Sequence, residues 1–326
     1  MLQYIGRRVL QFIPVFLGVV LVLFLLTRVI PGDPVAMLSG EKSANPTVVA
    51  NMRHAYGLDL PIWQQYVKYV GDILHGDFGR SIATGRPVKD IFLEKYPYTV
   101  KLALAAIVIE IIIGIGAGII SAVKQYSFWD VTVTLSTSLL VSLPVFWLGM
   151  LLQVFFGIWL KQWTHGQFYL PISGAGGPAS PFPSWVYLIL PAITLASVST
   201  AYAARIQRSQ LLEVNGSDYI RTARAKGLSD NAVLWRHSMK NALIPVVTFI
   251  ALDLGAMMAG AILTETVFNW PGIGYTIYLA INKRDWPVVI GSTIIVTLVY
   301  MILNLVVDIS YAFLDPRIRY GSSQGR

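Results

Sequence analysis

Six long apolar stretches constrain this chain more than any other feature of its sequence. A helix that crosses the hydrocarbon core of a bilayer needs about 20 mainly apolar residues. Six stretches meet that length, at approximately residues 9–30, 98–123, 131–160, 185–204, 243–268 and 287–314. Only 13% of the residues are charged, whereas soluble domains carry roughly 25% charged residues. The sequence therefore predicts an all-α integral membrane protein with about six transmembrane helices.

The first stretch resembles a secretory signal peptide because Arg7 and Arg8 precede it. It is longer, however, than the apolar region of about 7–15 residues that signal peptides carry. No pair of small residues marks a cleavage site after it, and Pro31-Gly32-Asp33-Pro34 follows instead. We therefore expect a first transmembrane helix that the mature protein retains.

A polar segment, residues 31–97, separates the first two apolar stretches and mixes acidic, basic and aromatic side chains. Apolar residues recur at helical spacing between residues 62 and 74, which predicts a small amphipathic helix. A segment of this size is near the lower limit for an independent core, so we expect a small extracytoplasmic cap. The predicted domains are 1–30 (N-terminus and first helix), 31–97 (cap) and 98–326 (a five-helix core with a cytoplasmic loop at 205–242).

Basic residues are distributed unevenly between the two sides of the predicted membrane core. Short loops on the cytoplasmic side of a membrane protein carry an excess of Lys and Arg. The segment 205–240 is rich in both, whereas the short loops on the opposite side hold only Lys161, Lys283 and Arg284. The distribution predicts that both termini are cytoplasmic. The net charge of +8 thus reflects membrane orientation, and no basic run with interleaved aromatic residues indicates a nucleic-acid partner.

The segment between the fourth and fifth stretches has the pattern of a helical hairpin. Ser217 or Asp218 can cap the start of a short helix, because their side-chain oxygens accept first-turn N–H groups. Gly227 suits the end of that helix, and Ser229 or Asp230 can begin a second helix that leads to Pro245.

The short helix combines an apolar patch with a basic rim, and two interpretations of it stay open. The patch consists of Tyr219, Ile220 and Ala223, and the rim includes Arg221, Arg224 and Lys226. Such a helix can occupy a groove on a partner protein. It can equally be an ordinary basic loop of the kind that faces the cytoplasm.

Sequence patterns that support catalysis are missing. Nucleotide hydrolysis needs a phosphate-binding Gly-x-x-x-x-Gly-Lys-Ser/Thr loop, and the chain has none. Gly114, Gly116 and Gly118 lie inside an apolar stretch, where they favour close packing against a neighbouring helix. The chain has no cysteine, and its four histidines lie in separate loops. We predict no catalytic residues, no metal site and no cofactor on this chain.

The hairpin segment resembles the coupling loop of bacterial ABC importer permeases, which docks onto the ATP-binding subunit. The shared features are Ala223, Gly227 and Pro245 at their relative spacing. Arg221-Thr222 and Met239-Lys240 depart from the general family pattern, and these departures resemble its dipeptide/oligopeptide branch. Further segments resemble that branch in the same order: Tyr4–Pro14, Pro31–Pro34, Tyr56–Pro61, Gly76–Ser81 with Pro87-Val88, Glu265–Gly274 and Asp315–Arg319.

The ordered resemblance identifies the chain as a member of the B-type permease subunits of the bacterial dipeptide/oligopeptide (peptide/nickel) ABC importers. It implies a type I importer fold in the bacterial inner membrane and a second homologous permease as partner. It also implies two ATP-binding subunits that hold ATP and Mg, and an extracytoplasmic substrate-binding protein. Coupling to the ATPases would involve Tyr219, Ile220, Arg221, Ala223, Arg224 and Gly227. One alternative to peptide import is the same kind of permease for nickel, glutathione or another small solute. The other is an ion-coupled secondary transporter.

Four acidic residues fall within the apolar stretches, where ionisable groups face a cavity or a partner. Glu110 and Asp253 lie deepest, whereas Glu265 and Asp308 lie near the ends. The two deep carboxyl groups either line the solute path or are buried at the interface with the partner permease.

A turn with an aromatic residue follows the fifth stretch. Trp270, Pro271 and Gly272 form either an outer gate, which the resemblance favours, or an aromatic anchor at the membrane surface.

Overall fold

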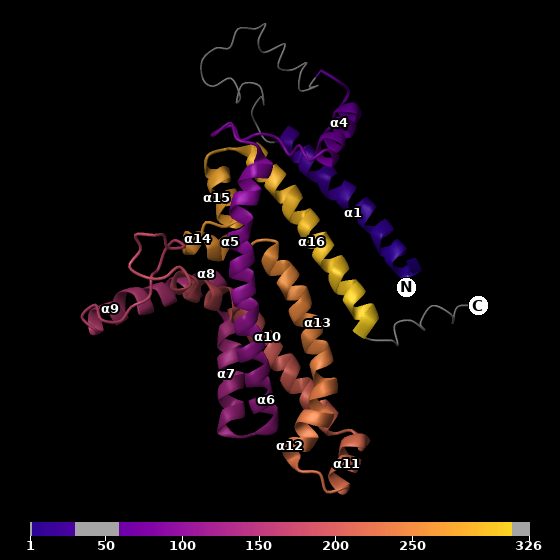
Figure 1. The fold of residues 1–326 in the computed structure, drawn as a ribbon, viewed down its shortest axis with the longest axis vertical. Helices are drawn as coiled ribbons and strands as arrows, with labels where there is room; N and C mark the ends of the chain where they lie inside the picture. The colour runs from indigo at the N-terminus through magenta and orange to yellow at the C-terminus, as the bar shows by residue number, and fades with distance from the viewer. Residues whose placement is uncertain (1, 30–58, 315–326) are drawn as a thin grey trace. The chain divides into compact units, whose positions relative to one another are not determined.

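The computed structural model describes residues 2–29 and 59–314, which are mainly helical (Figure 1). The predicted segments Pro31–Pro34 and 315–319, and the first half of Tyr56–Pro61, lie outside these described residues. Within these residues, six helical segments are long and apolar enough to cross a membrane, at Gly6–Leu26, Val88–Val123, Val145–Trp163, Val186–Asn215, Asp230–Met258 and Trp286–Ile309. The prediction of an all-α protein with about six transmembrane helices is confirmed.

The chain packs as two compact units, one formed by residues 1–96 and 276–326 and the other by residues 97–275. Helices α5 (Val88–Ile109) and α15 (Ile273–Asn282) each contribute to both units.

In the first unit, α1 (Leu2–Val29) packs against α16 (Trp286–Leu314) and against α4 (Ile62–Leu74). Val20, Ile73, Ile290 and Ile294 form the buried core among these three helices. The helix predicted over 62–74 is confirmed, because its inward side chains match the apolar positions of the sequence pattern. Ile62 is the exception, since its side chain is 56% exposed.

A buried carboxylate fixes the loop that precedes α5. Asp285, next to the start of α16, accepts hydrogen bonds from the Ser81 hydroxyl (2.5 Å) and the Ile82 N–H (3.0 Å). The chain then enters α5 at Val88, which packs against Val288. The helix therefore begins before residue 98, where the apolar composition of the sequence placed its start.

The second unit is organised around α10 (Val186–Asn215), half of whose residues are buried. It contacts the π-helical segment η1 (Glu110–Ile115), α6 (Gly116–Val123), α7 (Phe128–Ser142), α8 (Val145–Leu152) and α13 (Met239–Met258). Gly114 and Gly118 allow close approach of the neighbouring backbone: a β-carbon at Gly118 would lie 2.6 Å from the carbonyl oxygen of Ala204. The predicted close packing therefore holds for these two glycines, whereas Gly116 faces open space.

Two stretches that were predicted as continuous helices are interrupted. The stretch 131–160 breaks between α7 and α8, because Leu143 is extended (φ −91°, ψ 133°) before Pro144, and a residue that precedes proline disfavours helical geometry. The helical run then continues through η2 (Gln153–Trp159) to α9 (Leu160–Trp163).

The stretch 243–268 is the second interrupted one. It ends as α13 at Met258, and a separate short helix, α14 (Ile262–Val267), follows Gly260, which has φ +121°. Both expectations of one unbroken helix were wrong, since composition reports apolar length and does not report where the backbone turns.

The glycines of α6 and η1 provide a paired test of packing. We expect Gly118→Ala to lower the free energy of unfolding by about 1–3 kcal/mol, because the added methyl group overlaps Ala204 and Gln207 of α10. Gly116→Ala is the matched control, because its methyl group meets open space and alanine favours the helix. Thermal unfolding of the purified protein in detergent checks both; equal unfolding temperatures would contradict the packing of α6 on α10.

Candidate functional site

A helical hairpin extends from the ends of α10 and α13 (Figure 1). After α10 ends at Asn215, the chain forms α11 (Asp218–Ala225), turns at Gly227 and enters α12 (Asp230–Val233). Gly227 has φ +78°, a conformation that glycine adopts without steric cost. The Ser229 hydroxyl accepts a hydrogen bond from the Ala232 N–H (3.4 Å), and helical structure continues through η3 (Leu234–Ser238) into α13. The predicted helix–turn–helix is confirmed.

The apolar side of α11 faces the inside of this hairpin. Ile220 and Ala223 are buried against Val233 of α12, with Val214 of α10 packed beside them. The structure therefore corrects the interpretation of these two side chains as part of an open patch, because burial within the hairpin already satisfies them. Of the predicted coupling residues, those that remain exposed are Tyr219, Arg221, Arg224 and Gly227.

Side-chain hydrogen bonds fix the hairpin to the helices that support it. Ser238 of η3 donates to the side-chain oxygen of Asn215 on α10 (2.6 Å). Asn241 of α13 donates to the phenolic oxygen of Tyr219 on α11 (2.8 Å). Both helices that enter the hairpin are thus connected to it by polar contacts as well as by the backbone.

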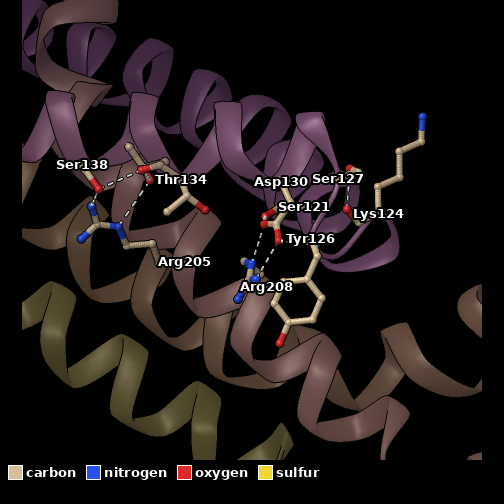
Figure 2. Close-up of polar contacts among 10 residues, drawn as sticks. Ser121, Lys124, Tyr126, Ser127, Asp130, Thr134, Ser138, Arg205 and Arg208 are labelled. Carbon is tan, nitrogen blue, oxygen red and sulfur yellow. Dashed lines mark hydrogen bonds and ion pairs between the residues drawn. The ribbon is translucent and has the colours of Figure 1, made fainter.

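About two turns before α10 ends, an ion pair joins it to the first turn of α7 (Figure 2). Arg208 donates from Nε and Nη2 to the two carboxylate oxygens of Asp130, at 2.8 and 2.9 Å. The Tyr126 N–H (2.9 Å) and the Ser121 hydroxyl also donate to Asp130. These donors, Arg208 first, hold the pKa of Asp130 well below its usual range.

A second arginine, one turn earlier on α10, contacts the same helix (Figure 2). Arg205 donates to the hydroxyl oxygens of Thr137 (3.4 Å) and Ser138 (3.1 Å) on α7. We call Asp130, Arg208, Arg205, Thr137 and Ser138 the α7–α10 clamp. Sequence reasoning missed this clamp, and its signal was weak: two arginines at helical spacing and one aspartate near a helix start, far apart in the chain.

Glu110 and Asp253, which the sequence placed deepest in the apolar stretches, come together in the structure. Glu110 is the first residue of η1 and is fully buried, and Asp253 of α13 is its carboxylate neighbour. The Ser199 hydroxyl of α10 also lies beside Asp253. No N–H or hydroxyl group among the described residues donates a hydrogen bond to either side-chain oxygen of Glu110 or to Oδ2 of Asp253, so the two carboxyl groups meet each other without another donor.

Asp253 and Ser199 belong to the wall of a cavity of about 400 Å³ between α10 and α13. The cavity is lined by Leu195, Val198, Ser199, Tyr202, Phe249, Asp253, Ala256, Met257, Gly260 and Ala261. Its wall is thus mainly apolar, with an acidic group at one place.

Trp270, Pro271 and Gly272 form a packed turn between α14 and α15. The Trp270 indole is 3% exposed and donates to the carbonyl oxygen of Tyr98 (2.9 Å). At Gly272 any side chain would collide with the carboxylate of Glu265. The structure thus buries the tryptophan inside the protein, which corrects the alternative of an anchor at the membrane surface.

Glu265 holds this turn in place, although the sequence placed it only near the end of a stretch. Its fully buried carboxylate accepts hydrogen bonds from the Thr99 hydroxyl (2.7 Å) and the Tyr275 N–H (2.8 Å). It therefore lies at the start of α15, where a helix favours negative charge.

The pairing of Asp130 predicts a pH-dependent contribution to stability. Its pKa is lower in the folded protein than in the unfolded chain, so the contribution is complete well above pH 4 and is lost as the pH falls. We expect Asp130→Asn to reduce the free energy of unfolding by about 1.5–3 kcal/mol at pH 7. The difference from the wild type should shrink below about pH 4.

Unfolding in detergent, followed at several pH values, checks this expectation. Asp218→Asn is the matched control, because Asp218 pairs with Arg221 at the exposed surface (3.5 Å) and such pairs contribute little. A difference between Asp130→Asn and the wild type that stayed constant down to acid pH would contradict the assigned charge state.

Comparisons with known proteins show which family the chain belongs to. Residues 114–320 match the family described as "Binding-protein-dependent transport system inner membrane component", and residues 1–103 match the N-terminal family of the same systems. The dipeptide transport system permease protein of Alkalihalophilus pseudofirmus is 40% identical, over 98% of this chain and 100% of that relative. The di/tripeptide permease protein of Pseudomonas aeruginosa is 41% identical, over 98% and 99% of the two chains.

A third relative, the dipeptide transport system permease protein of Escherichia coli K12, is 39% identical over 98% of this chain and 99% of its own length. These matches cover the chain from end to end, and they confirm the resemblance drawn from the hairpin and the segments around it. The chain therefore belongs to the family of binding-protein-dependent transport system inner membrane components, as a multi-pass permease subunit of an ABC importer.

Proposed function

We propose that this chain forms one half of the translocation path of an ATP-driven importer of dipeptides and oligopeptides. The observation that carries the proposal is the identity of 39–41% over nearly the full length to permeases named for dipeptides or di/tripeptides. Such similarity extends through the buried helices that would surround a solute as well as through the hairpin.

The proposed complex contains a second homologous permease, two ATP-binding subunits and an extracytoplasmic binding protein that delivers the substrate. ATP and Mg bind the ATPase subunits, and this chain itself catalyses no reaction. The lack of a phosphate-binding glycine loop in its sequence supports that division of roles. The chain lies in the lipid of the bacterial inner membrane with both termini and the α11 hairpin in the cytoplasm.

Coupling to ATP hydrolysis runs through α11 in this proposal. Tyr219, Arg221 and Arg224 are exposed and would contact an ATPase subunit, whereas Ile220, Ala223 and Gly227 maintain the shape of the hairpin. A movement of α11 would then reach the core through α10, to which the hairpin is joined by the two residues Gly216 and Ser217.

The solute path and the outer gate use the two remaining groups of residues. Glu110 and Asp253 line the path in this proposal, supported by the cavity beside Asp253. Trp270, Pro271 and Gly272 form the outer gate, supported by their tight packing on Tyr98 and Glu265, which would let the turn respond as one body to movement of α5.

Reconstitution tests the proposed function. The chain would be co-purified with its partners, inserted into liposomes containing ATP, and supplied with binding protein and labelled dipeptide. ATP-dependent uptake of the dipeptide supports the proposal. Uptake of nickel or glutathione and not of peptides would assign the importer to another solute, and uptake that follows an ion gradient and ignores ATP would contradict it.

Reversal of charge on the exposed side of α11 tests the coupling role. We expect Arg221→Glu to reduce substrate-stimulated ATP hydrolysis and dipeptide uptake by about tenfold, equivalent to about 1.4 kcal/mol. The reason is that the substitution reverses the charge of a side chain that contacts the ATPase in this proposal. Insertion and thermal stability should stay unchanged, since the Arg221 side chain is 78% exposed and its pair with Asp218 is weak.

Lys283→Glu serves as the control, because it reverses an exposed charge outside the hairpin. Wild-type coupling in Arg221→Glu would rule out a docking role for this residue.

A further inference from the structure

We propose that Asp253 and Glu110 form a binding subsite for a primary ammonium group, and that the free amino terminus of a transported peptide occupies it. This inference rests on the proposed peptide import and deepens it, because it names the chemical group that the path recognises and the atoms that recognise it.

The first argument is the unsatisfied state of the two carboxyl groups. Glu110 is completely buried, and no N–H or hydroxyl group among the described residues donates to its side-chain oxygens, so its polar neighbour is the carboxyl group of Asp253. Oδ2 of Asp253 is in the same condition. Burial of a carboxylate without a partner is costly, and within a transmembrane segment such a group indicates a functional partner. The chain keeps two of them side by side.

The second argument is the cavity beside Asp253, the member of the pair that lines it. Asp253 is part of the wall of the 400 Å³ cavity, and Ser199 adds a hydroxyl oxygen next to it. None of the ten lining residues is basic, so no side chain in the wall can neutralise the acid. A positive charge that balances the acid would therefore come from outside the wall, as from a cationic ligand.

The third argument is the match between the cavity and the chemistry of an amino terminus. An ammonium group has three N–H donors and no acceptor, which suits the free oxygens of Asp253 and Glu110 together with the Ser199 hydroxyl. Leu195, Phe249 and Met257 form apolar wall beside the acid. An ammonium group that carries an apolar or small side chain on the adjacent carbon therefore fits this space better than a hydrated metal ion, which prefers several oxygen ligands.

The local backbone supports a specialised role for this region. Glu110 begins η1, a π-helical segment inside an otherwise α-helical run, and such segments are frequent at functional sites. The chain leaves α13 through Gly260 and Ala261, which belong to the cavity wall. One irregular stretch therefore contains Glu110, and the other lines the cavity that Asp253 also lines.

A proton shared between the two carboxyl groups would be the alternative that needs no ligand. The two explanations differ in one respect: a shared proton gives no discrimination between ligands with and without an ammonium group. The test therefore compares the dipeptide dialanine with N-acetyl-dialanine, which keeps the chain and the carboxylate but has no ammonium group.

The experiment measures thermal stabilisation of the assembled transporter in detergent, without the binding protein, as each peptide is titrated. We expect dialanine to stabilise the wild type at concentrations at which N-acetyl-dialanine has no effect. Asp253→Asn and Glu110→Gln should weaken the apparent affinity for dialanine by about tenfold or more, the effect of losing a charge-assisted hydrogen bond. Glu213→Gln, which removes an exposed carboxylate of α10, should leave it unchanged.

Equal responses of the wild type to the two peptides would overturn the inference, and this comparison stands even if a variant fails to assemble. Unchanged affinity for dialanine in both carboxamide variants would overturn it as well, in favour of a shared proton. In either case, ATP-driven uptake of dialanine by the wild type in liposomes would leave peptide import intact. Loss of that uptake in the wild type would instead contradict the proposed function itself.

Discussion

Close contact between α10 and its neighbours is the interaction on which the unit 97–275 depends. In lipid, apolar side chains gain little from leaving the hydrocarbon to contact one another, so helices associate through tight packing and interhelical hydrogen bonds. Gly114 and Gly118 supply the tight packing on one side of α10, and the α7–α10 clamp supplies the hydrogen bonds. This packing positions both the hairpin that follows α10 and the Glu110–Asp253 pair that lies beside α10.

Apolar length and helical spacing were sufficient to predict much of the fold. The apolar residues of segment 62–74 recur at helical spacing, as in an amphipathic helix. Gly227 was expected to end the short helix, and its positive φ is one that glycine adopts without strain. The breaks at Pro144 and Gly260 were not predicted, because both lie within runs that remain apolar throughout. A proline inside α10, at Pro191, causes no such break, so the residue type alone does not decide.

The candidate sites depend more on contacts between distant segments, and this is where sequence reasoning ended. Glu110 and Asp253 could be singled out as costly acids in apolar stretches, but their approach to each other follows from the packing of η1 beside α13. Asp130 and Arg208 gave no signal separately, since single charges near helix ends are common. Ile220 and Ala223 were recognised as apolar, and only the fold of the hairpin shows that they face inward.

The α7–α10 clamp determines how large a part of the protein must move when the hairpin moves. Two arginines one turn apart prevent α10 from rotating about its own axis relative to α7, because rotation would break both contacts at once. A force on α11 can therefore be relieved by bending at Gly216 or by displacement of α7 and α10 together, and not by α10 alone. Because α7 and α10 move as one body, the link at Gly216 is the point at which a movement of α11 would first be lost as local bending.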